Sequence, residues 1–115
     1  MSELQGIARF KFREGKVEEF KRLSAQCMEI VQTQDTGTLQ YEIYFNDDES
    51  ECIVLERYTD EQALIEHGEH IGEGLMEAVV ATGSVHGELL GELSPQLKAN
   101  LAGGPVQPFT LYRSM

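Results

Sequence analysis

The sequence predicts an α+β fold with the ferredoxin-like element order β-α-β-β-α-β, followed by an additional helix and strand. Apolar residues alternate at a period of two in residues 4–13 and 39–45, as they do in strands with one better-buried face, and residues 51–58 are a third strand-like stretch. They recur every three or four residues in two intervening stretches, as in amphipathic helices. This order is typical of an antiparallel sheet with helices on one face.

A chain of 115 residues can form one hydrophobic core. We therefore expect a single domain over residues 1–115, with a core of about 4–93 and a C-terminal extension of 94–115. Strands of mixed burial leave the second face of the sheet partly apolar. A chain this short cannot cover that face itself, so we expect a second copy of the sheet to cover it in a homodimer.

The first half of the chain supplies a helix and a hairpin after the first strand. Val17 opens a helical period that runs to about Gln34, and the flexible Gly37 follows it. The polar stretch NDDES is expected to turn the chain between strands 39–45 and 51–58. The second of these strands is apolar on both faces at its centre, which indicates that both sides are covered.

A second helix is expected to start directly after this hairpin. Thr59 with Gln62 fits a capping box, and Asp60 alone would also cap the helix. Gly68 and Gly72 lower the helix propensity, so a bend or break is expected before the apolar stretch GLMEAVVAT.

The last third of the chain predicts a strand, a short helix and a terminal strand. The strand is expected over 84–93. Ser94 is a good cap for the helix, and Pro95 fits its first turn, where the missing N–H has no cost. The terminal strand is expected over 106–112. Because Pro108 cannot donate to a ladder, this strand belongs on a sheet edge or at a crossover to another subunit.

The composition excludes several partner classes. The net charge of −11 arises from 20 acidic and 9 basic side chains, which disfavours nucleic acid and anionic membrane surfaces as partners. No segment has the roughly 20 apolar residues of a membrane helix, and no signal peptide is evident, so we expect a cytoplasmic protein. Cys27 and Cys52 lie in apolar patterns without a CxxC motif, which is typical of small buried residues in a reducing compartment rather than of a metal site.

Three segments resemble a known family when taken in order. REGKVEEFKRL, GTLQYEIYFNDDES and IVLERYTDEQALIEH resemble the antibiotic biosynthesis monooxygenase family of dimeric α+β barrels, and the match covers about residues 4–80. The resemblance implies a homodimer with a pocket in each subunit between sheet and helices. Some relatives oxygenate quinols or polycyclic phenols with dioxygen, without metal or flavin. Others degrade haem, and one isomerises a small sugar derivative.

The resemblance also bears on the site and on its cofactors. Glu56, Tyr58 and His67 fall on the strand-to-helix signature, with Tyr58 where the family usually has Trp. The haem-degrading branch depends on a first-strand Asn and a pocket Trp, whereas this chain has Ala8 at the first-strand position and no Trp. Haem degradation is therefore not expected. The resemblance to the cofactor-independent members implies no cofactor and no metal.

His67 is the first candidate for a catalytic group, because it shares the sheet-facing side of its helix with Ala63 and Ile71. A core histidine bonded to a carbonyl or to Glu56 is the plain alternative. If His67 is functional, it would take a proton from a phenol or quinol while Glu56 fixes its tautomer. Tyr58 would then belong to the pocket wall.

Four further residues are candidates for substrate binding. His70 could share a metal with His67, but no third ligand is evident, and an exposed histidine at a helix end is the simpler interpretation. His86 could line the pocket or face a dimer interface. Tyr41 lies on the strand face opposite Tyr44, so only one of these two can face the helices. Arg9 could steer an anionic substrate or be a solvated charge.

Three classes of function remain open from the sequence. The first is a small oxygenase without cofactor that acts on a quinol-like or other aromatic compound, with His67 as base and Glu56 as the orienting group. The second is a ligand-binding or structural barrel without turnover. The third is an isomerase of a small carbonyl compound that uses the same histidine. Oxygen consumption distinguishes the first class from the other two.

Overall fold

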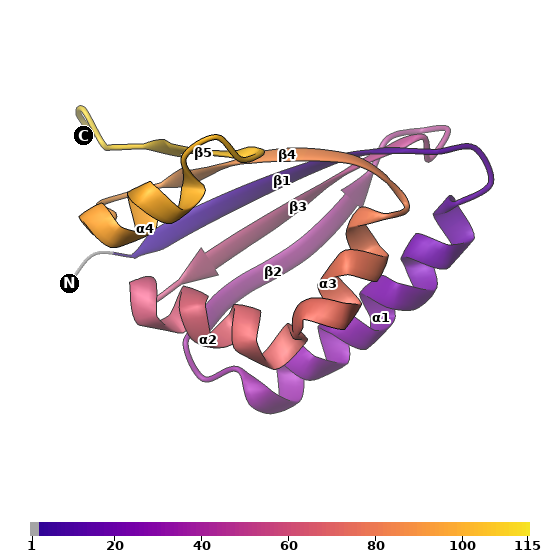
Figure 1. Ribbon diagram of the computed structural model, residues 1–115, viewed down its shortest axis with the longest axis horizontal. Helices are drawn as coiled ribbons and strands as arrows, with labels where there is room; N and C mark the ends of the chain where they lie inside the picture. The colour runs from indigo at the N-terminus through magenta and orange to yellow at the C-terminus, as the bar shows by residue number, and fades with distance from the viewer. Residues whose placement is uncertain (1–2) are drawn as a thin grey trace.

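The computed structural model describes residues 3–115, which form nine helices and strands (Figure 1). In chain order these elements are β1 (Leu4–Phe12), α1 (Val17–Gln34), β2 (Thr38–Phe45), β3 (Glu51–Tyr58), α2 (Glu61–Ile71), α3 (Glu73–Val80), β4 (Gly83–Leu90), α4 (Pro95–Leu101) and β5 (Val106–Phe109). The predicted α+β class and the β-α-β-β-α-β order with an additional helix and strand are confirmed.

The strands form one sheet in the order β2-β3-β1-β4-β5. β1 pairs antiparallel with β3 and β4, and β2 pairs antiparallel with β3. β5 is added parallel to β4 at the edge. Figure 1 shows α1, α2 and α3 on one side of the sheet, and α4 packs in one apolar cluster with Leu64 of α2. None of the helices within residues 3–115 covers the opposite side. We call that opposite side the open face.

The helix boundaries follow the caps that the sequence offers. α1 spans the predicted residues, and α2 begins after Asp60, whose side chain accepts a hydrogen bond from the N–H of Ala63. Asp60 is therefore the cap, and the Thr59 capping box is not used. The break between α2 and α3 occurs at Gly72, which has φ 82° and ψ 156°, a conformation almost restricted to glycine.

Two predicted strands are shorter than expected. β4 ends at Leu90 instead of residue 93, because Gly91 adopts φ 138° and turns the chain away from β1. β5 ends at Phe109 instead of residue 112. The start of α4 is as predicted, with the Ser94 hydroxyl accepting from the N–H of Leu97 and Pro95 in the first turn.

Two apolar clusters hold the helices on the sheet. The larger joins α1, α2 and α3 to the central strands around Phe10 and Phe20, whose ring centroids are 5.2 Å apart. The smaller surrounds Leu4 and Leu89 at the other end of the sheet, where side chains of α4 and β5 also pack. This second cluster attaches the C-terminal elements to the rest of the molecule.

The free edge of β5 is marked by a proline. The N–H groups of Gly87 on β4 and of Gly91 just after it donate to the carbonyls of Pro105 and Phe109, respectively. Odd-numbered residues of this segment therefore direct their peptide groups at β4, and the nitrogen of Pro108 is directed outward. The prediction that Pro108 lies on an edge is confirmed.

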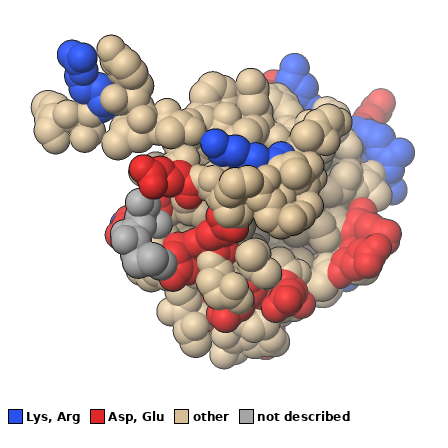
Figure 2. Space-filling view, turned by 60° about the vertical axis from the view of Figure 1, so that its left-hand side comes forward, with Lys and Arg blue, Asp and Glu red and all other residues tan. Residues whose placement is uncertain are grey.

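The surface is dominated by acidic side chains. Figure 2 shows Asp and Glu gathered over one face, with fewer Lys and Arg, as the net charge of −11 requires. Residues 110–115 are exposed and lack regular structure, and Figures 1 and 2 show the C-terminal end of the chain standing away from the body. None of the helices in residues 3–115 is both long and apolar enough to cross a membrane.

Candidate functional site

A cavity of about 380 Å³ lies between the sheet and the helices. This volume is in the range of small-molecule sites. Its wall is mostly apolar, and the polar side chains that reach it are few: Ser24, Tyr41, Glu56, His67 and His86. The arrangement of an apolar wall with a few convergent polar groups is the usual form of a ligand site.

His67 is positioned in this wall by α2 and oriented by Asp35. The His67 side chain is only 7% exposed, and its Nδ1 lies 2.8 Å from Oδ2 of Asp35, whose side chain is 2% exposed. Since the carboxylate accepts, Nδ1 carries the proton in neutral His67 and Nε2 keeps a lone pair. An imidazole in this tautomer can accept a proton at Nε2.

Asp35 reaches α2 because the loop after α1 packs closely on it. Asp35 is the C-cap residue of α1, and its N–H donates to the carbonyl of Val31. Gly37 follows, and a Cβ at that position would lie 2.5 Å from the Cβ of Ala63 and 2.8 Å from the hydroxyl oxygen of Thr59. Only glycine permits this approach, which places the carboxylate beside the α2 histidines.

Asp35 is shared by two histidines and a threonine. His70 Nδ1 lies 2.7 Å from Oδ1, and the hydroxyl of Thr38 donates to Oδ2 at 2.7 Å. Burial by itself would raise the pKa of Asp35. The hydrogen bonds from His70, Thr38 and His67 outweigh it and leave the pKa below its ordinary value. Asp35 is therefore an ionised acceptor that fixes both rings.

Glu56 does not orient His67, which corrects the sequence-based expectation. Glu56 lines the cavity from β3, and its carboxylate accepts a short hydrogen bond from the hydroxyl of Tyr58. Burial raises the pKa of Glu56 above the ordinary value, although the Tyr58 bond and the neighbouring His67 act in the opposite direction. The cavity thus contains a carboxyl group that favours its protonated form.

Two tyrosines surround His67 on the sheet side. The rings of Tyr41 and Tyr58 each lie 5.5 Å from the His67 ring between centroids. Tyr41 lines the cavity, and burial raises its pKa, so its hydroxyl stays protonated. Tyr58 was expected in the pocket wall but is 0% exposed. It lies behind the wall and supports His67 and Glu56.

Arg9 and His70 lie outside the cavity wall. Arg9 is on the open face, where its Nε contacts Glu88 at 3.2 Å, so it is an ion-paired surface charge. His70 bonds Asp35 from the outer side and is 29% exposed. His86 contributes to one edge of the cavity and also to the open face. Arg9 therefore lies away from the cavity, and His70 lies next to the site through its bond to Asp35.

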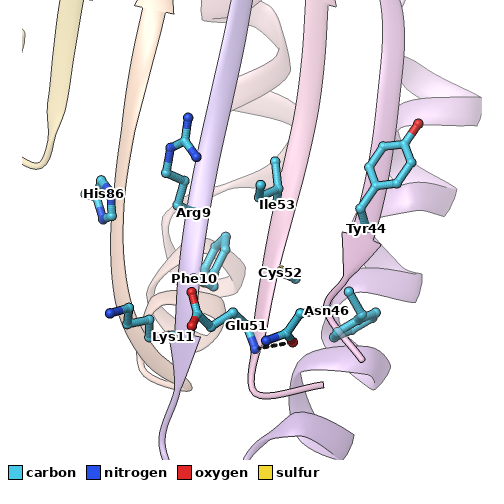
Figure 3. A pocket seen from close by; sticks show the side chains of 10 residues that line it. Arg9, Phe10, Lys11, Tyr44, Asn46, Glu51, Cys52, Ile53 and His86 are labelled. Atoms are coloured by element: carbon cyan, nitrogen blue, oxygen red, sulfur yellow. Dashed lines mark hydrogen bonds between the residues drawn. The ribbon is translucent and has the colours of Figure 1, made fainter. Parts of the chain in front are cut away.

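A second hollow of about 460 Å³ lies on the open face (Figure 3). Arg9, Lys11, Tyr44 and His86 stand around it, on strands whose other side faces the helices. Tyr41 and Tyr44 are therefore on opposite faces, as predicted. This hollow has none of the oriented acid–base groups of the helix-side cavity, which remains the candidate site.

The family comparison agrees with this architecture. The family model described as antibiotic biosynthesis monooxygenase matches residues 6–70, more than half of the chain. This chain belongs to that family. The matched region contains Asp35, Glu56 and His67. No curated protein has significant sequence similarity to the chain.

Solved structures of similar fold extend this result. MupZ from Pseudomonas fluorescens is 26% identical over 100% of this chain and 94% of its own, with a TM-score of 0.83. Rv0793 from Mycobacterium tuberculosis is 25% identical over 81% of this chain and 97% of its own, with a TM-score of 0.69. SnoaB, a cofactor-independent oxygenase from Streptomyces nogalater, shares the fold at 15% identity and a TM-score of 0.65, over 82% of this chain and 96% of its own.

Asp35 is the site residue that sequence reasoning missed. His67 could be found because its helical spacing indicates which side of α2 faces the sheet. Asp35 directly follows a helix, its neighbour in sequence among its partners is Thr38, and it meets His67 across 32 positions. The only signal was the pair of residues Asp35 and Gly37 at a helix end. Among residues 3–115, no three His, Cys, Asp or Glu side chains are grouped as metal ligands.

Proposed function

We propose that this family member is a cofactor-independent monooxygenase that acts on a quinol, anthrone or similar aromatic compound. The observation that carries the proposal is the pair of His67 and Asp35 at the wall of an apolar cavity. A cofactor-independent oxygenase of the same fold supports it. The aromatic and aliphatic wall suits a ring compound, and His67 supplies a base.

In the first step, Nε2 of His67 accepts the acidic proton of the substrate. Asp35 stabilises the imidazolium that forms, because its carboxylate already accepts from Nδ1. The electron-rich substrate anion then gives one electron to dioxygen, and the radical and superoxide combine at carbon. The resulting peroxide anion takes the proton back from His67 and becomes a hydroperoxide. The hydroperoxide loses water to leave a carbonyl. The apolar wall keeps bulk water from the intermediates.

Oxygen uptake by the purified, metal-stripped protein with a panel of quinols and anthrones tests this function. His67→Ala and Asp35→Asn are expected to lower kcat by about 10²- to 10⁴-fold, the usual contribution of general-base catalysis. Asp48→Asn is the matched control, because it makes the same change at an exposed loop position. Wild-type uptake no faster than autoxidation would rule out the oxygenase. Uptake that survives both site variants would keep it and remove His67 as base.

Glu56 favours a second candidate function, an isomerase of a small carbonyl compound. A carboxyl group whose pKa is raised by burial lies in the same cavity as a histidine, and two such groups can work as an acid–base pair. His67 would remove a proton next to a carbonyl, and Glu56 would protonate the carbonyl oxygen. Deuterium uptake from D₂O into the substrate carbon without oxygen consumption is expected for this function. Its absence from wild type, or its persistence in Glu56→Gln, would count against this function.

We also propose a homodimer formed through the open face, in a cytoplasmic protein. Ile53 and Tyr44 are 36% and 52% exposed there, on neighbouring strands (Figure 3). A second sheet on this face would remove that apolar surface from water. The cytoplasmic location accords with Cys27 and Cys52, which are both free and buried.

A further inference from the structure

The C-terminal segment, residues 94–109, borders the candidate cavity. Pro105 and Val106 belong to the cavity wall, although they come from the end of the chain. β5 stands beyond β4 in the sheet, so these two residues close the cavity at the sheet edge. The family model stops at residue 70, and this side of the wall therefore lies outside the matched region.

α3, which leads into β4, supplies exposed residues of the cavity wall. Met76 and Val80 of α3 line the cavity and are 42% and 39% exposed, so the cavity meets solvent beside them. His86 and Val106 supply lining from the β4 and β5 side. A ligand that enters here passes between an apolar helix surface and the C-terminal segment.

A specific contact holds the C-terminal segment in place. The backbone N–H and the hydroxyl of Ser94 both donate to the carboxylate of Glu61, at 2.8 and 2.6 Å. These bonds lower the pKa of Glu61, so it is ionised at neutral pH. Leu97 and Val106 also pack in the smaller apolar cluster. The segment is thus fixed to α2 and to the sheet on both sides of the loop that carries Pro105.

We propose that the C-terminal segment determines which ligands the cavity accepts, with Val106 as the residue that limits their size. The ligand class is a compact, uncharged ring compound, because the wall is mostly apolar and contains no lysine or arginine among the described residues that could pair with an anion. This inference rests on the proposed function only in taking the cavity as the ligand site. It assigns selectivity to a wall that takes no part in proton transfer.

Two uncharged fluorescent probes of different size test the assignment without any turnover. 1-Naphthylamine is the smaller probe and N-phenyl-1-naphthylamine the larger. Val106→Phe is expected to weaken the binding of the larger probe about tenfold more than the binding of the smaller probe. Val106→Ala is expected to shift the ratio of the two affinities several-fold in favour of the larger probe. Gln107→Ala is the matched control, since Gln107 is the exposed neighbour on the same strand and does not line the cavity.

The outcomes separate the selectivity from the chemistry. Opposite shifts of the affinity ratio in the two Val106 variants, with none in Gln107→Ala, support the assignment. An unchanged ratio in both variants, with binding retained, overturns it and leaves the oxygenase intact. If the affinity ratios shift as predicted but the wild-type protein takes up no oxygen, only the oxygenase proposal is overturned. A wild-type protein that binds neither probe overturns both.

The contact between Glu61 and Ser94 provides a second, independent test. Glu61→Ala is expected to speed the association of N-phenyl-1-naphthylamine several-fold. It is also expected to accelerate hydrogen exchange at the amides of Gly87 and Gly91, which donate hydrogen bonds to the segment. Glu69→Ala is the control on the exposed side of α2. Unchanged association despite faster exchange would show that the segment does not control entry.

Discussion

At the scale of single residues, Glu56 makes the stability of the protein depend on pH. Its pKa is raised above the ordinary value of 4.5, mainly by burial, so the folded state holds the proton more tightly than the unfolded state. The contribution of Glu56 to stability is therefore fully present below about pH 4.5. It is lost as the pH rises through the folded-state pKa.

The variant Glu56→Gln is predicted to flatten this dependence. The amide of the variant cannot ionise. The free energy of unfolding of Glu56→Gln is therefore expected to fall less than that of the wild type above pH 4.5. The difference should be about 1.4 kcal/mol for each unit of pKa shift. Urea unfolding at a series of pH values measures this, with the exposed Glu69→Gln as control. Parallel curves for Glu56→Gln and wild type would show that Glu56 is not desolvated.

The residue scale also shows where prediction from sequence stops. His67 was found because one helix repeats its facing residues at a known period. Its partner Asp35 was not, since that contact forms only when two distant segments pack. The sequence suggests that Glu56 fixes the tautomer of His67, but the hydrogen-bond donor to Glu56 is Tyr58 instead of His67. The period of apolar residues indicates which way a side chain points, but it does not identify the hydrogen-bond partner of that side chain.

At the scale of elements, the α1–β2 loop controls the geometry of the site. Gly37 allows the loop to touch α2, and the N–H of Thr59 donates to the Gly37 carbonyl at 2.9 Å. This contact holds Asp35 at the correct distance from His67. The sequence indicated Gly37 as a helix terminator, whereas its main role is to permit close packing.

Gly37→Ala is predicted to lower the free energy of unfolding by about 1–3 kcal/mol, the range for overpacking a tight contact. The added methyl group is also expected to push the loop with Asp35 away from His67. Oxygen uptake should therefore fall by more than the loss of folded protein explains. Gly74→Ala is the control, because nothing lies within 4 Å of a Cβ at that helical position. A fully stable and active Gly37→Ala protein would show that the loop adapts.

At the scale of the whole molecule, the element order was predictable because each helix and strand carries its own period of apolar residues. The ends of β4 and β5 were not, since a strand stops where its neighbour stops pairing or where a residue such as Gly91 turns the backbone. The cavity depends on side chains from six or more elements. Its shape therefore belongs to tertiary packing and could only be outlined from sequence.

The open face leads to a prediction about assembly. Wild-type protein is expected to have twice the chain mass in light scattering coupled to size exclusion. Ile53→Lys is expected to shift it to the monomer, because a lysine ammonium would be buried at the centre of the face. Thr33→Lys on the exposed side of α1 is the control. A dimer that withstands Ile53→Lys would place the interface elsewhere.

The proline on the outer edge of β5 has a consequence for concentrated protein. A bare strand edge can recruit another chain and propagate into fibrils. Pro108 presents no N–H along that edge, so an incoming strand meets a gap in the ladder at the centre of a strand of four residues. Growth by templated addition is blocked on this side. Copies of the protein can associate through their faces without the risk of polymerising through β5.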